Sequence, residues 1–162
     1  MSEQIFEQWL NPSTMMAGER EVLSRGDAAI PILRCLLDGS AKNAYGIPYR
    51  NLGLPLRCAL EVALGLGERA SELEALIVPE LKRGDVTAAR VLAKFGHVGE
   101  STIVCLAEAL TSSDYELRYE AANALIQLQA KNHPVVTLAL EQSAVAQAIW
   151  TKVSNIASGL AR

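Results

Sequence analysis

The sequence has little of what marks a membrane-spanning or secreted protein. No apolar run approaches the ~20 residues that span a bilayer, and the first residues, MSEQIFEQWL, lack the basic start and apolar core of a signal peptide. Cysteine is scarce and odd in number: Cys35, Cys58 and Cys105 form no CxxC pair, and each lies in an apolar helical pattern. Cysteine in such a pattern usually behaves as a small hydrophobe. We therefore expect a cytoplasmic protein with reduced core thiols and no membrane contact.

Charge of one sign does not accumulate anywhere along the chain. The 15 basic and 18 acidic residues are interspersed and leave a net charge of −3. A nucleic-acid-binding protein normally carries a basic stripe, because neutralising phosphates supplies most of its affinity. The charge pattern therefore disfavours a nucleic-acid partner and leaves a local basic patch as an open alternative.

The short motifs of the common catalytic and metal sites are also missing. There is no GxSxG, HExxH, GxGxxG or P-loop pattern, and neither His97 nor His133 has a second ligand at metal spacing. Both histidines fall in turns between helical patterns, where we expect them to be exposed. The many glutamates on these patterns are typical of a solvated helix face. The sequence thus predicts no catalytic residue, no metal and no cofactor.

What the chain does contain is a repeated helical pattern. The segments RCALEVALGLG (57–67), VTAARVLAKFG (86–96) and RYEAANALIQL (118–128) align on their leucines, which lie 28 and 33 residues apart. A second apolar stretch with helical spacing lies next to each aligned segment. No alternating run of β-branched residues, which would indicate a strand, is present. A period near 30 in an all-helical pattern indicates a stacked array of helix pairs.

These residues resemble a known family. The run R-x-x-A-A-x-A-L at residues 118–125, together with second helices such as GDAAIPILRCLLDG (26–39), is similar to the HEAT repeat in its short bacterial form. The resemblance covers roughly residues 13–145 and implies one all-α domain, a right-handed α-α superhelix. It also implies that Arg57 and Arg118 bridge neighbouring repeats to a carboxylate such as Asp85 or Asp114. The third repeat lacks this arginine.

The expected elements follow from the apolar spacing and the glycines. We predict one domain over residues 1–162, with an N-terminal cap helix at 2–10, helix pairs at 13–38, 55–83, 86–111 and 115–143, a C-terminal helix at 144–161 and an inserted loop at 39–54. Whether 134–161 forms one helix or two stays open. We expect left-handed helix ends at Gly26, Gly39, Gly67, Gly84 and Gly96. We expect N-caps at Asp27 and Ser101, and packing roles for Trp9 and Trp150.

Two surfaces are candidates for binding. The second helices of such an array line a concave face, and its polar positions here mix charges with an acidic excess, at Arg34, Asp38, Glu72, Glu80 and Glu108. That mixture favours a protein partner with a basic surface. The 39–54 insertion is long for a connection between helices and carries Tyr45, Tyr49 and Arg50, residue types enriched at interface hot spots. Its tyrosines either contact a partner or fold back to fill a gap between repeats.

Function follows from the resemblance only as an expectation, because HEAT arrays have many unrelated roles. We expect a non-catalytic protein–protein interaction module in a bacterial cell, such as an adaptor or a toxin-neutralising, immunity-type protein. Two alternatives stay open, both from HEAT-like families: a nucleic-acid-binding protein related to the alkylpurine DNA glycosylases, and a phycobilin-lyase-like subunit. The oligomeric state cannot be predicted from the sequence.

Overall fold

The computed structural model describes residues 2–159, which are mostly helical and contain no strand. The predicted all-α class is therefore confirmed. None of the helices in this range is long and apolar enough to cross a bilayer. The chain divides into two compact units, Met1–Ile77 and Val78–Arg162, with the boundary inside one helix.

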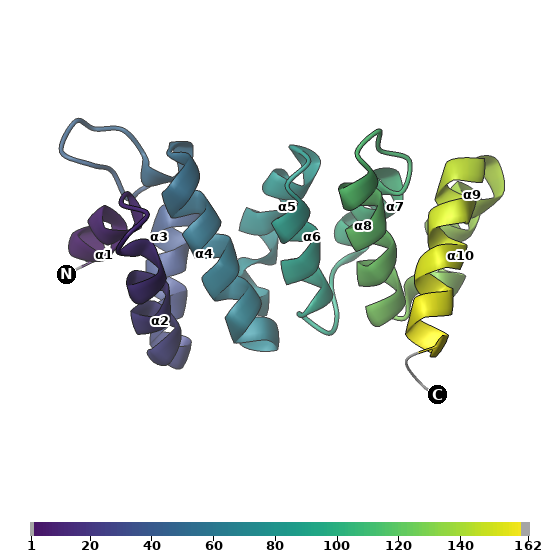
Figure 1. The fold of residues 1–162 in the computed structure, drawn as a ribbon, viewed down its shortest axis with the longest axis horizontal. Coiled ribbons are helices and arrows are strands. Elements are labelled where there is room, and N and C mark those ends of the chain that lie inside the picture. Colours follow the sequence, from purple (N-terminus) through teal and green to yellow (C-terminus); the bar gives the residue numbers. More distant parts are fainter. Residues whose placement is uncertain (1, 160–162) are drawn as a thin grey trace. The chain divides into compact units, whose positions relative to one another are not determined.

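The first unit contains four α-helices and the start of a fifth, linked by 3₁₀ turns. They are α1 (Ser2–Trp9), α2 (Met15–Ser24), α3 (Ile30–Leu37), α4 (Gly53–Leu66) and the beginning of α5 (Glu74–Lys82), with 3₁₀ turns at Gly26–Ala29, Tyr49–Asn51 and Gly67–Leu73. Within this unit α2 packs between α1 and α4, and α3 packs on α4 (Figure 1). Trp9 is fully buried, as its predicted packing role requires. Gly18 makes room for it, because a Cβ on Gly18 would lie 2.8 Å from Trp9 Nε1.

The second unit contains the remainder of α5 and five further α-helices. They are α6 (Val86–Ala93), α7 (Glu100–Ala109), α8 (Tyr115–Gln127), α9 (Pro134–Gln142) and α10 (Ala144–Gly159). Within the unit α8 packs against α6 on one side and α10 on the other, while α7 packs on α9 (Figure 1). The contacts α7 with α8 and α9 with α10 join these two rows of helices. Trp150 is buried in this packing, as its predicted role requires. The stacking of helix pairs stays a prediction.

The helix bounds agree with the predicted ranges to within a few residues. The 134–161 segment forms two helices separated at Ser143, and residues 160 and 161 lie outside the described part of the chain. All five glycines expected at helix ends have positive φ, between 58° and 91°. In this backbone region glycine is favoured because it has no Cβ to clash.

The predicted N-caps are wrong. Asp27 lies within a 3₁₀ turn, and its carboxylate accepts from Arg69 Nε at 2.8 Å. Ser101 lies inside α7, which follows Gly99. Side chains that do accept from the first backbone N–H groups of a helix include Asp85 on α6, Asp114 on α8, His133 on α9 and Ser143 on α10.

The three cysteines differ in exposure. Cys58 and Cys105 are buried as predicted, whereas Cys35 is exposed. The prediction was wrong for Cys35 because α3 turns Leu33, Leu36 and Leu37 to the core and leaves Cys35 on its solvent side. Burial, followed by a hydrogen bond with Glu19, raises the pKa of the Cys58 thiol to about 12.

These environments predict different thiol reactivity. At pH 8 the Cys58 thiol, with its pKa raised to about 12, holds its proton, and only the thiolate is nucleophilic. Iodoacetamide should therefore label Cys35 in the folded protein and label Cys58 only after unfolding in urea, as read by peptide mass spectrometry. The Cys35→Ser variant is the control and should remove the fast-labelling site. Equal labelling rates for Cys35 and Cys58 in the folded protein would contradict this description of the core.

Candidate functional site

The 39–54 loop is anchored to the first helix by Tyr49. The Tyr49 side chain is 2% exposed, and its hydroxyl donates a hydrogen bond to Glu7 Oε1 at 2.5 Å. Its ring lies against Phe6, with 5.1 Å between ring centroids. Of the two roles open for this tyrosine, packing is the one that the structure fits, because the ring is not on the surface.

The tip of the loop is held by hydrogen bonds of its own. Asn43 Oδ1 accepts from the backbone N–H groups of Tyr45 and Ile47, at 2.9 and 3.0 Å. The Asn43 N–H donates to the Ile47 carbonyl oxygen at 2.9 Å, and the Tyr49 N–H donates to that of Ala41 at 3.0 Å. Gly46, at φ +76°, makes the tight turn between them. The tip is therefore a defined turn whose shape does not depend on a partner.

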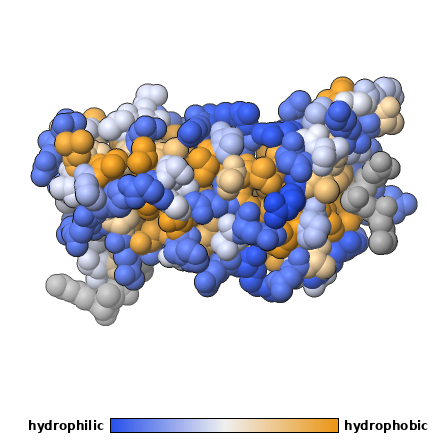
Figure 2. All heavy atoms as spheres, turned by 180° about the vertical axis from the view of Figure 1, so that it is seen from behind, coloured by the Kyte–Doolittle hydropathy of each residue, from blue (hydrophilic) through white to orange (hydrophobic). Residues whose placement is uncertain are grey.

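This turn exposes two large apolar side chains. Tyr45 is 88% exposed and Ile47 is 44% exposed. The loop projects from the first unit (Figure 1), and both hydrophobic and hydrophilic residues lie at the upper right of Figure 2, where the loop is seen from behind. Tyr45 is therefore not packed into a gap between repeats, and its contact with a partner stays a prediction. Arg50 is half-buried and its side chain lies over Gly39.

The polar candidates of the first unit form local interactions. Arg34 Nη2 lies 3.1 Å from Glu72 Oε1, with both side chains about half-exposed. The Asp38 carboxylate accepts from the Ser40 N–H at 2.8 Å. The structure thus brings Arg34 and Glu72 together as an ion pair.

The polar candidates of the second unit have different surroundings. Glu80 is 3% exposed and forms an ion pair with Arg83, so the expectation of a solvated position is wrong for Glu80. Glu108 is exposed and lines a pocket of about 400 Å³ with Lys82 and Arg83. Of these two glutamates, only Glu108 is available to a partner.

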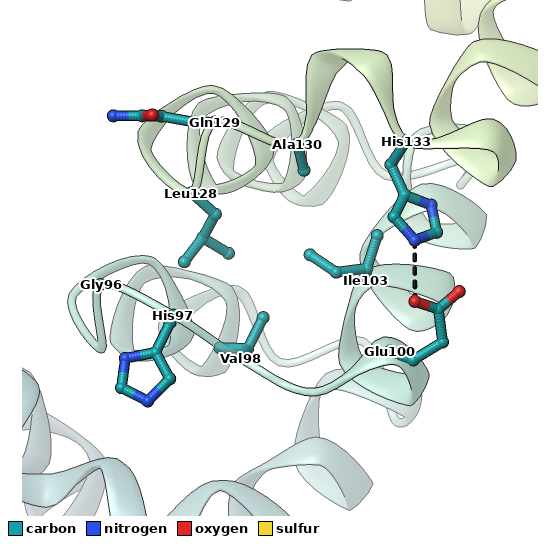
Figure 3. Close-up of a pocket in the computed structure, with 9 residues that line it drawn as sticks. All are labelled: Gly96, His97, Val98, Glu100, Ile103, Leu128, Gln129, Ala130 and His133. Atoms are coloured by element: carbon teal, nitrogen blue, oxygen red, sulfur yellow. Dashed lines mark hydrogen bonds and ion pairs between the residues drawn. The ribbon is translucent and has the colours of Figure 1, made fainter.

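A pocket of about 360 Å³ in the second unit contains both histidines of the chain (Figure 3). His97 is exposed, as predicted, and its ring points away from the other polar groups. His133 is only 21% exposed, so the prediction is wrong there: its Nε2 lies 2.8 Å from Glu100 Oε2. Its Nδ1 accepts from the Val135 N–H at 3.4 Å, which caps α9.

These bonds define what His133 can do. Because Nδ1 accepts a hydrogen bond from the backbone N–H of Val135, the ring donates its hydrogen bond to Glu100 through the Nε2–H group. A general base needs a lone pair aimed at its substrate, and the Nδ1 lone pair of His133 is already used by the cap of α9. Within residues 2–159 no group of three histidines, cysteines or carboxylates is placed to hold a metal ion. The Glu100–His133 pair therefore connects the start of α7 with the start of α9.

Arg118 differs from the role implied by the resemblance. Its Nη1 donates to the backbone carbonyl oxygens of Ser112 and Ser113, at 2.6 and 3.1 Å, and within residues 2–159 it pairs with no carboxylate. The expected partners, Asp85 and Asp114, cap α6 and α8 instead.

Sequence reasoning missed Tyr115 and Lys152. Lys152 Nζ donates to the Tyr115 hydroxyl at 2.7 Å, although the two residues are far apart in the sequence. Helical spacing places Tyr115 beside Arg118, but no local signal indicates Lys152.

The capping role of His133 predicts a specific order of stabilities. His133→Ala removes the acceptor for the Val135 N–H and should lower the free energy of unfolding by about 1 kcal/mol. His133→Asn restores an acceptor at the cap and should recover most of that loss, although it too lacks the bond to Glu100. Urea denaturation measures both.

Glu100→Gln is the matched control, because it removes the charge opposite the ring and leaves the cap. It should change stability by less than about 0.5 kcal/mol, as for a surface pair. Equal losses in the Ala and Asn variants would show that His133 does not act as a cap.

No protein-family model matches this chain, and no curated protein or solved structure matches it either.

Proposed function

We propose that this protein is a non-catalytic protein-binding module that presents the tip of the 39–54 loop to its partner. In this proposal the helix pairs form a HEAT-like right-handed superhelix in the cytoplasm, and the partner is another protein. The observation that carries the proposal is that an internally hydrogen-bonded turn exposes Tyr45 and Ile47.

Preorganisation makes this tip suited to binding. A loop that is already ordered loses less conformational freedom when a partner binds, so more of the contact energy appears as affinity. Tyrosine is enriched at interface hot spots, and the Tyr45 ring is almost fully exposed. Burying an exposed side chain such as isoleucine against a partner contributes about 1.5–3 kcal/mol to the free energy of binding. In the free protein this contribution is not made, because the side chain is in contact with water.

The chemistry of the tip describes the partner's contact surface. Tyr45 and Ile47 fit an apolar depression, and the exposed Lys42 beside them favours acidic residues at its rim. A basic region on the partner stays part of the proposal, facing the exposed Asp38 in the first unit or the exposed Glu108 in the second. Glu72 is also exposed but pairs with Arg34. An adaptor and a toxin-neutralising protein both have this kind of interface.

The loop tip is tested by a double substitution, Tyr45→Ala with Ile47→Ser. Both side chains are exposed, so the variant should stay within about 1 kcal/mol of the parent stability, as is usual for surface changes. Quantitative affinity purification from the native cell should show at least one protein reduced about tenfold or more relative to the parent, the loss expected when two anchors are removed.

Met16→Ala is the matched control, because Met16 is also apolar and 62% exposed in the first unit but lies outside the loop. It should leave the set of bound proteins unchanged. An unchanged set for the loop variant as well, with its fold intact by circular dichroism, would rule out the tip as the binding surface.

A further inference from the structure

A small pocket in the second unit lies at the start of α8 and the first half of α10. These two helices pack side by side (Figure 1). The pocket has a volume of about 230 Å³ and is lined by Tyr115, Arg118, Val145, Ala148, Ile149 and Lys152. It is separate from the 39–54 loop, which belongs to the first unit.

Two cations share one aromatic ring at this pocket. Lys152 Nζ lies 5.2 Å from the centroid of the Tyr115 ring and donates to its hydroxyl, and Arg118 Cζ lies 5.6 Å from the same centroid. The bond to Tyr115 raises the pKa of Lys152, so its ammonium keeps its charge at neutral pH. An ammonium has three donors, and the hydroxyl takes one of them.

No opposite charge lines the pocket among the described residues. Asp114, just before Tyr115, directs its carboxylate to the backbone N–H groups of Glu116 and Leu117. Residues 144–159 include no acidic residue at all. At the start of α8 the helix dipole is offset by Asp114 and Glu116, so the positive charge at the pocket comes from Lys152 and Arg118. The pocket is therefore a place where an anion is favoured.

The remaining surface of the pocket is apolar and open. Val145 is 50% exposed and Tyr115 49% exposed, whereas Ile149 is buried beneath them. Sites for drug-sized ligands usually measure about 300–1,000 Å³, so this smaller pocket accommodates a group of the size of one side chain. Its ligand therefore combines one apolar side chain with a carboxylate close beside it.

We propose that this pocket binds the C-terminal residue of a partner peptide that ends in an apolar side chain. The side chain lies against Val145 and Ile149, and the terminal carboxylate accepts from the Lys152 ammonium, with Arg118 adding to the positive potential. A C-terminal residue carries both groups on one Cα, whereas an internal acidic peptide needs two residues to supply them. The inference does not depend on the proposed role of the loop.

The test compares two probe peptides that differ only in the charge of their last group. N-acetyl-Gly-Gly-Leu with a free carboxylate is titrated into the full chain up to 10 mM, and the same peptide with a C-terminal amide serves as its control. Methyl NMR signals of Val145 and Ile149 report binding. The carboxylate peptide should saturate these signals in the millimolar range, and the amide should bind about tenfold more weakly, the loss expected for a charge-assisted contact.

Two lysine variants separate this site from general charge attraction. Lys152→Gln should weaken binding of the carboxylate peptide about tenfold, while Lys94→Gln, an exposed lysine after α6, should leave it unchanged. Circular dichroism verifies that both variants fold. The proposal is overturned if the two peptides bind equally, if Lys152→Gln binds like the parent, or if the Val145 and Ile149 signals do not respond.

Discussion

The contact between Tyr49 and the first helix is the interaction on which the proposed binding surface depends. The ring packs on Phe6 and the hydroxyl bonds to Glu7, so the end of the 39–54 loop is tied to a helix more than forty residues earlier. With that end held, the bonds of Asn43 can define a single turn at the tip. Tyr45 and Ile47 are then exposed on a turn with a defined shape. Without the anchor, the same residues would be part of a long connection with many conformations.

Most polar groups that resemble functional residues are used by the helix ends. Asp85, Asp114 and His133 accept from the first N–H groups of three helices, and Arg118 donates to two carbonyl oxygens before α8. Unpaired backbone groups at helix ends are costly when they are buried. A chain made of many short helices has many such ends, so many side chains are needed to form hydrogen bonds with their backbone groups. These four side chains are therefore accounted for by the ends of the helices.

The helices could be predicted from the sequence because two strong local signals agree. Apolar spacing shows where each helix lies, and glycine shows where the backbone must turn left-handed, as it does at Gly26, Gly39, Gly67, Gly84 and Gly96. The superhelix and the single domain stay predictions. The start of a helix was harder to predict, because a 3₁₀ turn and a pairing with Arg69 remove Asp27 from its expected cap.

The candidate sites were predictable as regions but not as residues. Tyr45 and Tyr49 are the same residue type four positions apart. Tyr49 is buried because it contacts Glu7 and Phe6, whereas Tyr45 is exposed. The burial of Glu80 and the bond from Lys152 to Tyr115 likewise depend on tertiary packing. Local sequence contains no information on such contacts, because the partner lies on another element or beyond a turn.

The most direct measurement of the central claim is backbone hydrogen exchange in the loop, read by NMR. The account predicts that the amides of Tyr45, Ile47 and Tyr49 exchange at least about tenfold more slowly than an unstructured chain, since each donates to an acceptor within the loop. The amide of Ala44, for which no such bond is described, serves as the internal reference. Exchange of all four amides at the rate of an unstructured chain would contradict the claim that the tip is a preformed binding surface.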